Sequence, residues 1–145
     1  MYMNEIDTHD LAWAAGFLDG EGNFDIGLNN HGTFYVIVQA TNVDPRPLLK
    51  LVALFGGKSR LSTREAGSRA KDVYRYRLVK GASKVVRMLR PYLVVKGEHA
   101  DVLLRMQDLV DGRKHKYAAL TDDELSARVA LRTEIRALNH RGRSA

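Results

Sequence analysis

Residues 12–24 read Ala12-Trp13-Ala14-Ala15-Gly16-Phe17-Leu18-Asp19-Gly20-Glu21-Gly22-Asn23-Phe24. The first half is apolar and built from small side chains, which is typical of a helix that packs closely against another element. The second half sets two acidic residues between glycines, which stop a helix. The helix therefore delivers Asp19 and Glu21 to a fixed point at its own end. Carboxylates held in this way suit a divalent metal, and a plain helix stop followed by a turn is the alternative.

The hydrophobic period and the turn residues predict the remaining elements. The first is a helix from Asp7 or Thr8 to about Asp19, ended by Gly20 and Gly22, and two strands follow it, Asn23 to Leu28 and Thr33 to Thr41, joined by a turn at 29–32. A second helix is opened by Asp44-Pro45 and stopped by Gly56-Gly57, and its apolar stripe is Leu48, Leu49, Leu51, Val52 and Phe55. Two more strands, Lys58 to Glu65 and Val73 to Val79, are joined near Gly67-Ser68, and helices follow at about 83–89, 98–111 and 121–139. This order predicts an α+β fold, one domain over residues 1–145, whose four-stranded antiparallel sheet carries helices on one face.

The other sheet face is predicted to bind nucleic acid, because alternation places basic and polar side chains together in the strands. A plain solvated face would mix Glu with Lys, whereas the third and fourth strands are almost purely basic on this side. Such side chains contact phosphates and base edges, and a curved antiparallel ribbon fits the major groove, so duplex DNA is favoured over RNA. The predicted DNA contacts are Asp25, Asn29, Thr33, Tyr35, Ile37, Gln39, Lys58, Arg60, Ser62, Arg64, Arg75 and Arg77.

Composition and charge agree with this prediction. The 145 residues are 45% hydrophobic with a formal net charge of +6, and residues 56–99 alone hold 12 basic and 3 acidic side chains, which suits a polyanionic partner. There is no cysteine, so disulfides and thiolate catalysis are excluded. No long apolar run or signal-peptide pattern is apparent, so we expect an intracellular protein without a membrane partner, in host cytoplasm or an organelle.

The first helix is also a candidate for self-association. Ala12, Ala15 and Gly16 offer small side chains at helical spacing, which lets two helix backbones approach closely. In a two-fold dimer the helix ends meet, and Asp19 and Glu21 are then repeated nearby. Carboxylates crowded in this way repel unless cations lie between them, and Mg²⁺ is a cation that needs only one or two protein carboxylates.

The stretch from Ala15 to Gly22 resembles the motif of the LAGLIDADG homing endonucleases, whose α-β-β-α-β-β-α core with a DNA-binding saddle also matches the predicted element order. Three further blocks are similar to that family: Val38 to Asn42, Pro91 to Lys96, and Ile135 to Asn139. The motif occurs once here, and single-motif members of the family act as homodimers. The two helices after the core are additions at the C-terminal end.

The resemblance implies a role for each matching residue. Glu21 would bind the metal together with the Gly20 carbonyl, and Asp19 would brace the paired helix ends. Lys96 would stabilise charge near the scissile phosphate or tune the attacking water, while Asn42 and Arg46 would order the surrounding water. The implied cofactor is Mg²⁺, with Mn²⁺ substituting and Ca²⁺ binding without supporting cleavage, and no small-molecule cofactor is expected.

The implied activity is that of a homodimeric, site-specific endonuclease that cuts double-stranded DNA within a long, near-palindromic target. The reaction would be phosphodiester hydrolysis by metal-activated water. The alternative is a catalytically silent protein of the same fold, either an RNA maturase or a DNA-binding regulator. A basic α+β nucleic-acid module unrelated to the family is a third reading.

Overall fold

The computed structural model describes residues 5–62 and 71–141. Its elements are α1 (Thr8–Glu21), β1 (Gly22–Leu28), β2 (Phe34–Asn42), α2 (Pro45–Phe55), β3 (Lys58–Ser62), β4 (Val73–Leu78), α3 (Ala82–Leu89), a 3-10 turn η1 (Arg90–Tyr92), α4 (Gly97–Asp111) and α5 (Asp122–Arg141). The predicted α+β class and element order are confirmed. The predicted turn near Gly67-Ser68 and the predicted contact Arg64 lie outside the described residues.

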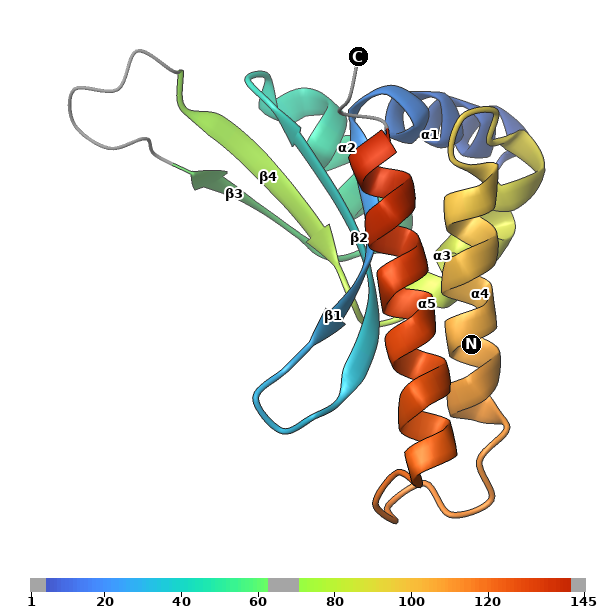
Figure 1. The fold of residues 1–145 in the computed structure, drawn as a ribbon. Helices are drawn as coiled ribbons and strands as arrows, with labels where there is room; N and C mark the ends of the chain where they lie inside the picture. The colour runs from blue at the N-terminus through green and yellow to red at the C-terminus, as the bar shows by residue number, and fades with distance from the viewer. Residues whose placement is uncertain (1–4, 63–70, 142–145) are drawn as a thin grey trace.

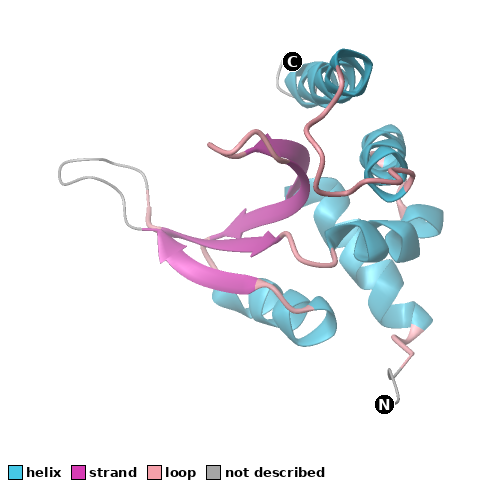
Figure 2. Ribbon diagram, turned by 90° about the horizontal axis from the view of Figure 1, so that it is seen from below, coloured by secondary structure: helices cyan, strands magenta, loops and turns pink. Residues whose placement is uncertain are grey.

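The four strands form one antiparallel sheet in the order β1-β2-β4-β3. Gly22 pairs with Ala40 across β1 and β2, and Arg77 of β4 pairs with Gln39 of β2 on one side. On its other side, β4 pairs with the short edge strand β3. The sheet curves, and Figures 1 and 2 show the helices gathered on one side of it while the other side stays open.

The core lies between the sheet and the helices, as strand alternation predicts. Phe24, Val38 and Tyr76 point toward the helices and are almost completely buried. The Tyr76 hydroxyl donates to the Gly56 carbonyl at 2.9 Å, and burial raises the pKa of this phenol to about 12. The predicted stripe of α2 was wrong at Leu49, which is 56% exposed, because it lies on the solvent side of the helix.

The end of α1 positions the candidate site. The helix begins at the predicted cap Asp7, whose carboxylate accepts from the His9 N–H at 2.6 Å, and it continues to Glu21, two residues further than predicted. Gly22 is the residue that ends it, and its N–H donates to the Leu18 carbonyl. A Cβ at Gly22 would lie 2.7 Å from that carbonyl oxygen, so this close approach requires glycine.

The C-terminal helix protects an edge of the sheet. Figure 1 shows α5 running beside β1, and two of its side chains reach carbonyls of that edge strand. Arg132 Nε donates to the Ile26 carbonyl at 3.2 Å and Asn139 Nδ2 to the Phe24 carbonyl at 2.9 Å. These bonds satisfy groups that an open edge would leave free for another chain. No helix of the described residues has the length and apolar character that crossing a membrane requires.

Candidate metal centre and nucleic-acid interface

Negative charge is concentrated at the C-terminal end of α1. Glu21 is the last residue of the helix and is exposed, and the last turn contains no basic side chain. The helix dipole adds partial negative charge at the same point, so a carboxylate here is unfavourable without a cation nearby. The end of α1 is therefore a place where a positive charge is stabilised.

Asp19 binds the segment that precedes α4. Its carboxylate accepts three backbone N–H groups, from Val94 at 2.8 Å, Val95 at 3.1 Å and Lys96 at 2.9 Å. The Lys96 ammonium in turn donates to the Asp19 backbone carbonyl at 2.7 Å. Both Asp19 carboxylate oxygens are thus used inside the chain, which leaves Glu21 as the free carboxylate of the motif.

Lys96 is half-buried beside the two motif acids. Burial lowers the pKa of its ammonium below the ordinary value, and the negative charges of Asp19 and Glu21 offset this only in part. The end of α1 and the residue before α4 are far apart in sequence, yet they bring Lys96 and Glu21 into one hollow of about 560 Å³. This hollow confirms the proximity of the two residues, while their roles stay predictions.

Glu21 lies between two hollows. The first also contains Asn23, Glu98, His99, Asn139 and Arg141, and the second, of about 320 Å³, contains Asn23, Gln39, Thr41 and Arg75. The second hollow opens on the polar face of the sheet, since Gln39 and Arg75 both lie on that face. The second hollow therefore connects Glu21 with the polar face of the sheet, while Lys96 lines only the first hollow.

Sequence reasoning assigned no role to His99, which lines the hollow that contains Glu21 and Lys96. Burial lowers the pKa of His99, and the nearby Lys96 ammonium lowers it further. Its Nδ1 is buried without a hydrogen-bond partner. The signal available in the sequence was its spacing, because His99 lies one helical turn after Lys96.

The structure does not place Asn42 and Arg46 in either hollow at Glu21. Both are used locally where α2 begins: the Asn42 side chain accepts from the Asp44 N–H at 2.9 Å, and the Arg46 guanidinium is held by the Asp44 carboxylate at 2.6 Å. The polar side chains that line the sheet-side hollow with Glu21 are Asn23, Gln39, Thr41 and Arg75, and the roles of Asn42 and Arg46 stay predictions.

The open face of the sheet carries cations without partners. Arg60 pairs in register with Arg75, and Lys58 with Arg77, so four positive charges lie side by side. Among the described residues, Lys58, Arg60 and Arg75 have no carboxylate within ion-pair distance, whereas several arginines of the helical layer do. Those ion pairs are Arg46–Asp44, Arg87–Asp108, Arg90–Asp101, Arg105–Glu134 and Arg113–Glu124.

The rest of this face differs in detail from the prediction. The Tyr35 ring lies across Gly27, where any Cβ would overlap it, and Arg77 Nη2 donates to the Tyr35 hydroxyl at 3.3 Å. Ile37 is on the predicted face but only 3% exposed, so it offers DNA almost no surface, because it lies on the central strand between β1 and β4.

Two further predicted DNA-contacting side chains, those of Asn29 and Asp25, already accept hydrogen bonds from nearby backbone N–H groups. The Asn29 side chain accepts from the N–H groups of His31 and Thr33 at 2.9 Å each, which shapes the β1–β2 turn. The Asp25 carboxylate accepts from the Ile26 N–H at 2.8 Å and lies 3.9 Å from Arg136. Thr33 and Ser62 are in the described part of the chain and are not fully buried.

The exposed face of α1 carries a different set of small residues from the predicted one. Ala12 and Gly16 are exposed, but Ala15 is completely buried in the chain's own core, so it was wrong as an interface residue. Gly20 joins Ala12 and Gly16 on the exposed face, four residues apart along the helix. Val94, 87% exposed, and Val95, 66% exposed, lie beside the end of this helix, where Asp19 holds them.

Comparison with solved structures identifies the fold. The homing endonuclease I-CvuI in complex with its target superposes with a TM-score of 0.68 at 22% identity, covering 91% of this chain and 85% of that one. Archaeal intron-encoded I-Vdi141I complexed with DNA gives 0.69 at 17% identity, covering 90% and 84%. The LAGLIDADG homing endonuclease I-SmaMI bound to cleaved DNA gives 0.64 at 20% identity, covering 91% of this chain and 45% of that one.

The chain therefore has the LAGLIDADG homing endonuclease fold, which is the fold that the sequence resemblance implies. No protein-family model matches the sequence, and comparison with curated protein sequences finds no match.

Proposed function

We propose that this protein is a site-specific endonuclease of the LAGLIDADG type that binds double-stranded DNA on the open face of its sheet. The observation that carries this proposal is the row of cations Lys58, Arg60 and Arg75, which have no acidic partner in the described part of the chain, next to a hollow that ends at Glu21. A polyanion would supply the missing negative charge. It would also place a phosphate within reach of Glu21 and Lys96.

We infer that the active form is a homodimer paired through α1. A Cβ at Gly16 or Gly20 would meet nothing within 4 Å in this chain, so the chain's own packing does not require glycine there. Glycine inside a helix costs about 1 kcal/mol relative to alanine, and close approach of a second helix gives a reason for it. The chain also corresponds to about half of I-SmaMI, and exposed Val94 and Val95 extend the same surface.

The residues at the end of α1 fit a divalent metal shared between two copies. Glu21 offers an exposed carboxylate and Gly20 a backbone carbonyl, whereas Asp19 is occupied by three N–H groups. Within residues 5–62 and 71–141 no cluster of three His, Asp or Glu could hold a metal ion. Mg²⁺ suits this sparse donor set, since it keeps several waters and binds substrate phosphates.

The chain's own groups would act on a phosphodiester as follows. A bound divalent cation supplies positive charge and lowers the pKa of water. Lys96, held in place by the Asp19 carbonyl, stabilises the negative charge that develops on the phosphate oxygens. Gln39, Thr41 and Asn23 order water on the sheet side of Glu21, and the basic face orients the duplex.

The test is cleavage of a plasmid that carries the sequence flanking the open reading frame, first with Mg²⁺ and then with Ca²⁺. We expect cutting with Mg²⁺ only, and Glu21→Gln should abolish cutting while DNA binding remains. Glu98→Gln removes a carboxylate from the same hollow outside the proposed ligand set, so its cleavage should fall far less. If Glu21→Gln cuts normally, the metal assignment is wrong, and DNA binding without any cleavage would support a regulator.

A further inference from the structure

Arg128, in the middle of α5, is the one charged residue of the described chain that is buried, with 5% of its surface exposed. It forms no hydrogen bond or ion pair with another residue of the described ranges, and its Nε is fully buried without a partner. Buried guanidinium groups ordinarily have carboxylate or carbonyl partners, because an unpaired buried charge is costly. The absence of a partner for Arg128 therefore needs an explanation.

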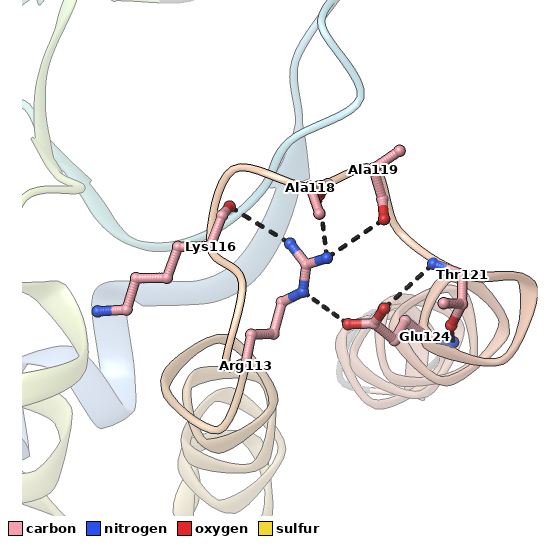
Figure 3. A network of polar contacts seen from close by, with 6 residues as sticks. All are labelled: Arg113, Lys116, Ala118, Ala119, Thr121 and Glu124. Carbon is pink, nitrogen blue, oxygen red and sulfur yellow. Dashed lines mark hydrogen bonds and ion pairs between the residues drawn. The ribbon is translucent and has the colours of Figure 1, made fainter.

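The nearest acid on the same helix is already occupied. Glu124, one turn before Arg128, accepts from Arg113 Nε at 2.6 Å through one oxygen and from the Thr121 N–H at 3.1 Å through the other. Arg113 also donates to the carbonyls of Lys116, Ala118 and Ala119 (Figure 3). The α4–α5 loop is thus folded around Arg113, and it offers nothing to Arg128.

Arg128 lines a hollow of about 650 Å³ between α5, the α4–α5 loop and the β1–β2 turn. The hollow is also lined by Arg113, Lys116 and residues 31–34, and none of its lining residues is acidic. Of the guanidinium nitrogens of Arg128, Nε is fully buried without a partner, and the two terminal nitrogens are not among such atoms. Burial and the charge of Arg113 both lower the pKa of Arg128, and Glu124 offsets this only in part.

We propose that this hollow binds a phosphate oxyanion through the terminal nitrogens of Arg128, with Lys116 at its rim. The planar guanidinium matches two phosphate oxygens, and the exposed lysine adds a positive charge. The anion has two possible sources, free inorganic phosphate or a backbone phosphate of DNA that runs past the sheet. Only the second source rests on the proposed function. Figure 1 shows the turn and loop together at the end of the molecule away from α1.

The first experiment uses inorganic phosphate and no DNA. At constant ionic strength, replacing chloride by phosphate should raise the Tm of the full chain by roughly 4 °C at about ten times the Kd. Arg128→Met keeps the length of the side chain, so it should unfold at a higher Tm than the native chain without phosphate and lose the phosphate response. Arg87→Met removes the same charge from α3 and should respond like the native chain.

Backbone amide NMR of the native chain keeps the test decisive if Arg128→Met fails to fold. Phosphate should shift the amides of residues 31–34 and 116–120, and a titration without shifts there overturns the proposal. A phosphate response that persists in Arg128→Met overturns it as well.

The second experiment identifies the source with a 40-base-pair duplex of arbitrary sequence. If a DNA phosphate occupies the hollow, Arg128→Met should lower the slope of log affinity against log salt by about one. An unchanged slope together with a lost phosphate response assigns the hollow to free phosphate. Failure of the chain to bind or cut DNA would contradict the proposed function and leave the phosphate result standing.

Discussion

Two hydrogen bonds join Asp19 and Lys96, one from the Lys96 backbone to the Asp19 side chain and one from the Lys96 side chain to the Asp19 backbone. The Asp19 carboxylate accepts the Lys96 backbone N–H at 2.9 Å, and the Lys96 ammonium donates to the Asp19 carbonyl at 2.7 Å. The first motif acid is therefore a positioning residue for Lys96, whereas the second is free to meet a ligand. The difference between the two acids lies in the backbone of residues 94–96, which the motif itself does not contain.

Asp19→Asn should destabilise the fold and misplace Lys96. An amide presents its NH₂ group to one of the three N–H donors, so at least one bond is replaced by a clash of donors. We expect a loss of about 1.5 kcal/mol in the free energy of unfolding, measured in urea, and a fall in cleavage rate with DNA affinity retained. Asp108→Asn, which affects an exposed pair 3.9 Å apart, should cost far less. Equal losses in both variants would contradict the positioning role.

The lowered pKa of Lys96 predicts a pH dependence of stability. At a pH between its folded pKa and the ordinary value of 10.5, the unfolded chain binds more protons at this residue than the folded chain does. The contribution of Lys96 to the free energy of unfolding should therefore rise as pH increases through that window. Urea titrations of the native chain and Lys96→Met between pH 8 and 10.5 measure it as the change in their difference, and a difference that falls with pH would refute the assignment.

The same shift predicts an alkaline limit to cleavage. If the ammonium stabilises developing negative charge, single-turnover cleavage should decline at a lower pH than an ordinary lysine would give. Lys96→Arg keeps a charge that does not titrate in this range, so its rate, although lower, should lose that alkaline decline. An identical decline in both proteins would assign it to another group.

The basic side chains on the open face of the sheet predict a selective effect on DNA binding. Arg75→Ala should weaken binding and lower the slope of log affinity against log salt by about one, because one phosphate contact is lost. Fluorescence anisotropy at several salt concentrations measures both quantities. Arg87→Ala, on the helical layer, is the matched control, and equal effects of the two substitutions would argue against the sheet as the interface.

Local patterns in the sequence predicted the elements and the sheet faces well. Arg75 and Arg77 alternate with buried Tyr76 and Leu78 as expected, because the side-chain period of a strand is fixed by its backbone. Which side chains on a given face of the sheet are exposed was less predictable. Ile37 lies on the correct face yet is buried, since its exposure depends on neighbouring strands that are distant in sequence.

The site was predictable only where the resemblance supplied it. Glu21 and Lys96 do line one hollow, but the bonds of Asp19 to residues 94–96 depend on tertiary placement that no local pattern contains. The roles of Asn42 and Arg46 stay predictions, because Asn-x-Asp-Pro-Arg also satisfies the start of a helix by local hydrogen bonds. His99 lies one helical turn after Lys96, but its burial beside that residue appears only in the folded chain.

Gly16→Leu tests whether α1 pairs with its own copy. In an isolated chain this substitution should not reduce stability, since nothing lies within 4 Å of a Cβ at Gly16 and leucine favours a helix more than glycine does. In a dimer packed through Ala12, Gly16 and Gly20 the larger side chain should separate the helices. We expect sedimentation velocity to show a dimer for the native chain and a monomer for Gly16→Leu, with cleavage lost. Ala130→Leu, on the exposed face of α5, should remain dimeric, and a dimer that survives Gly16→Leu would place the interface elsewhere.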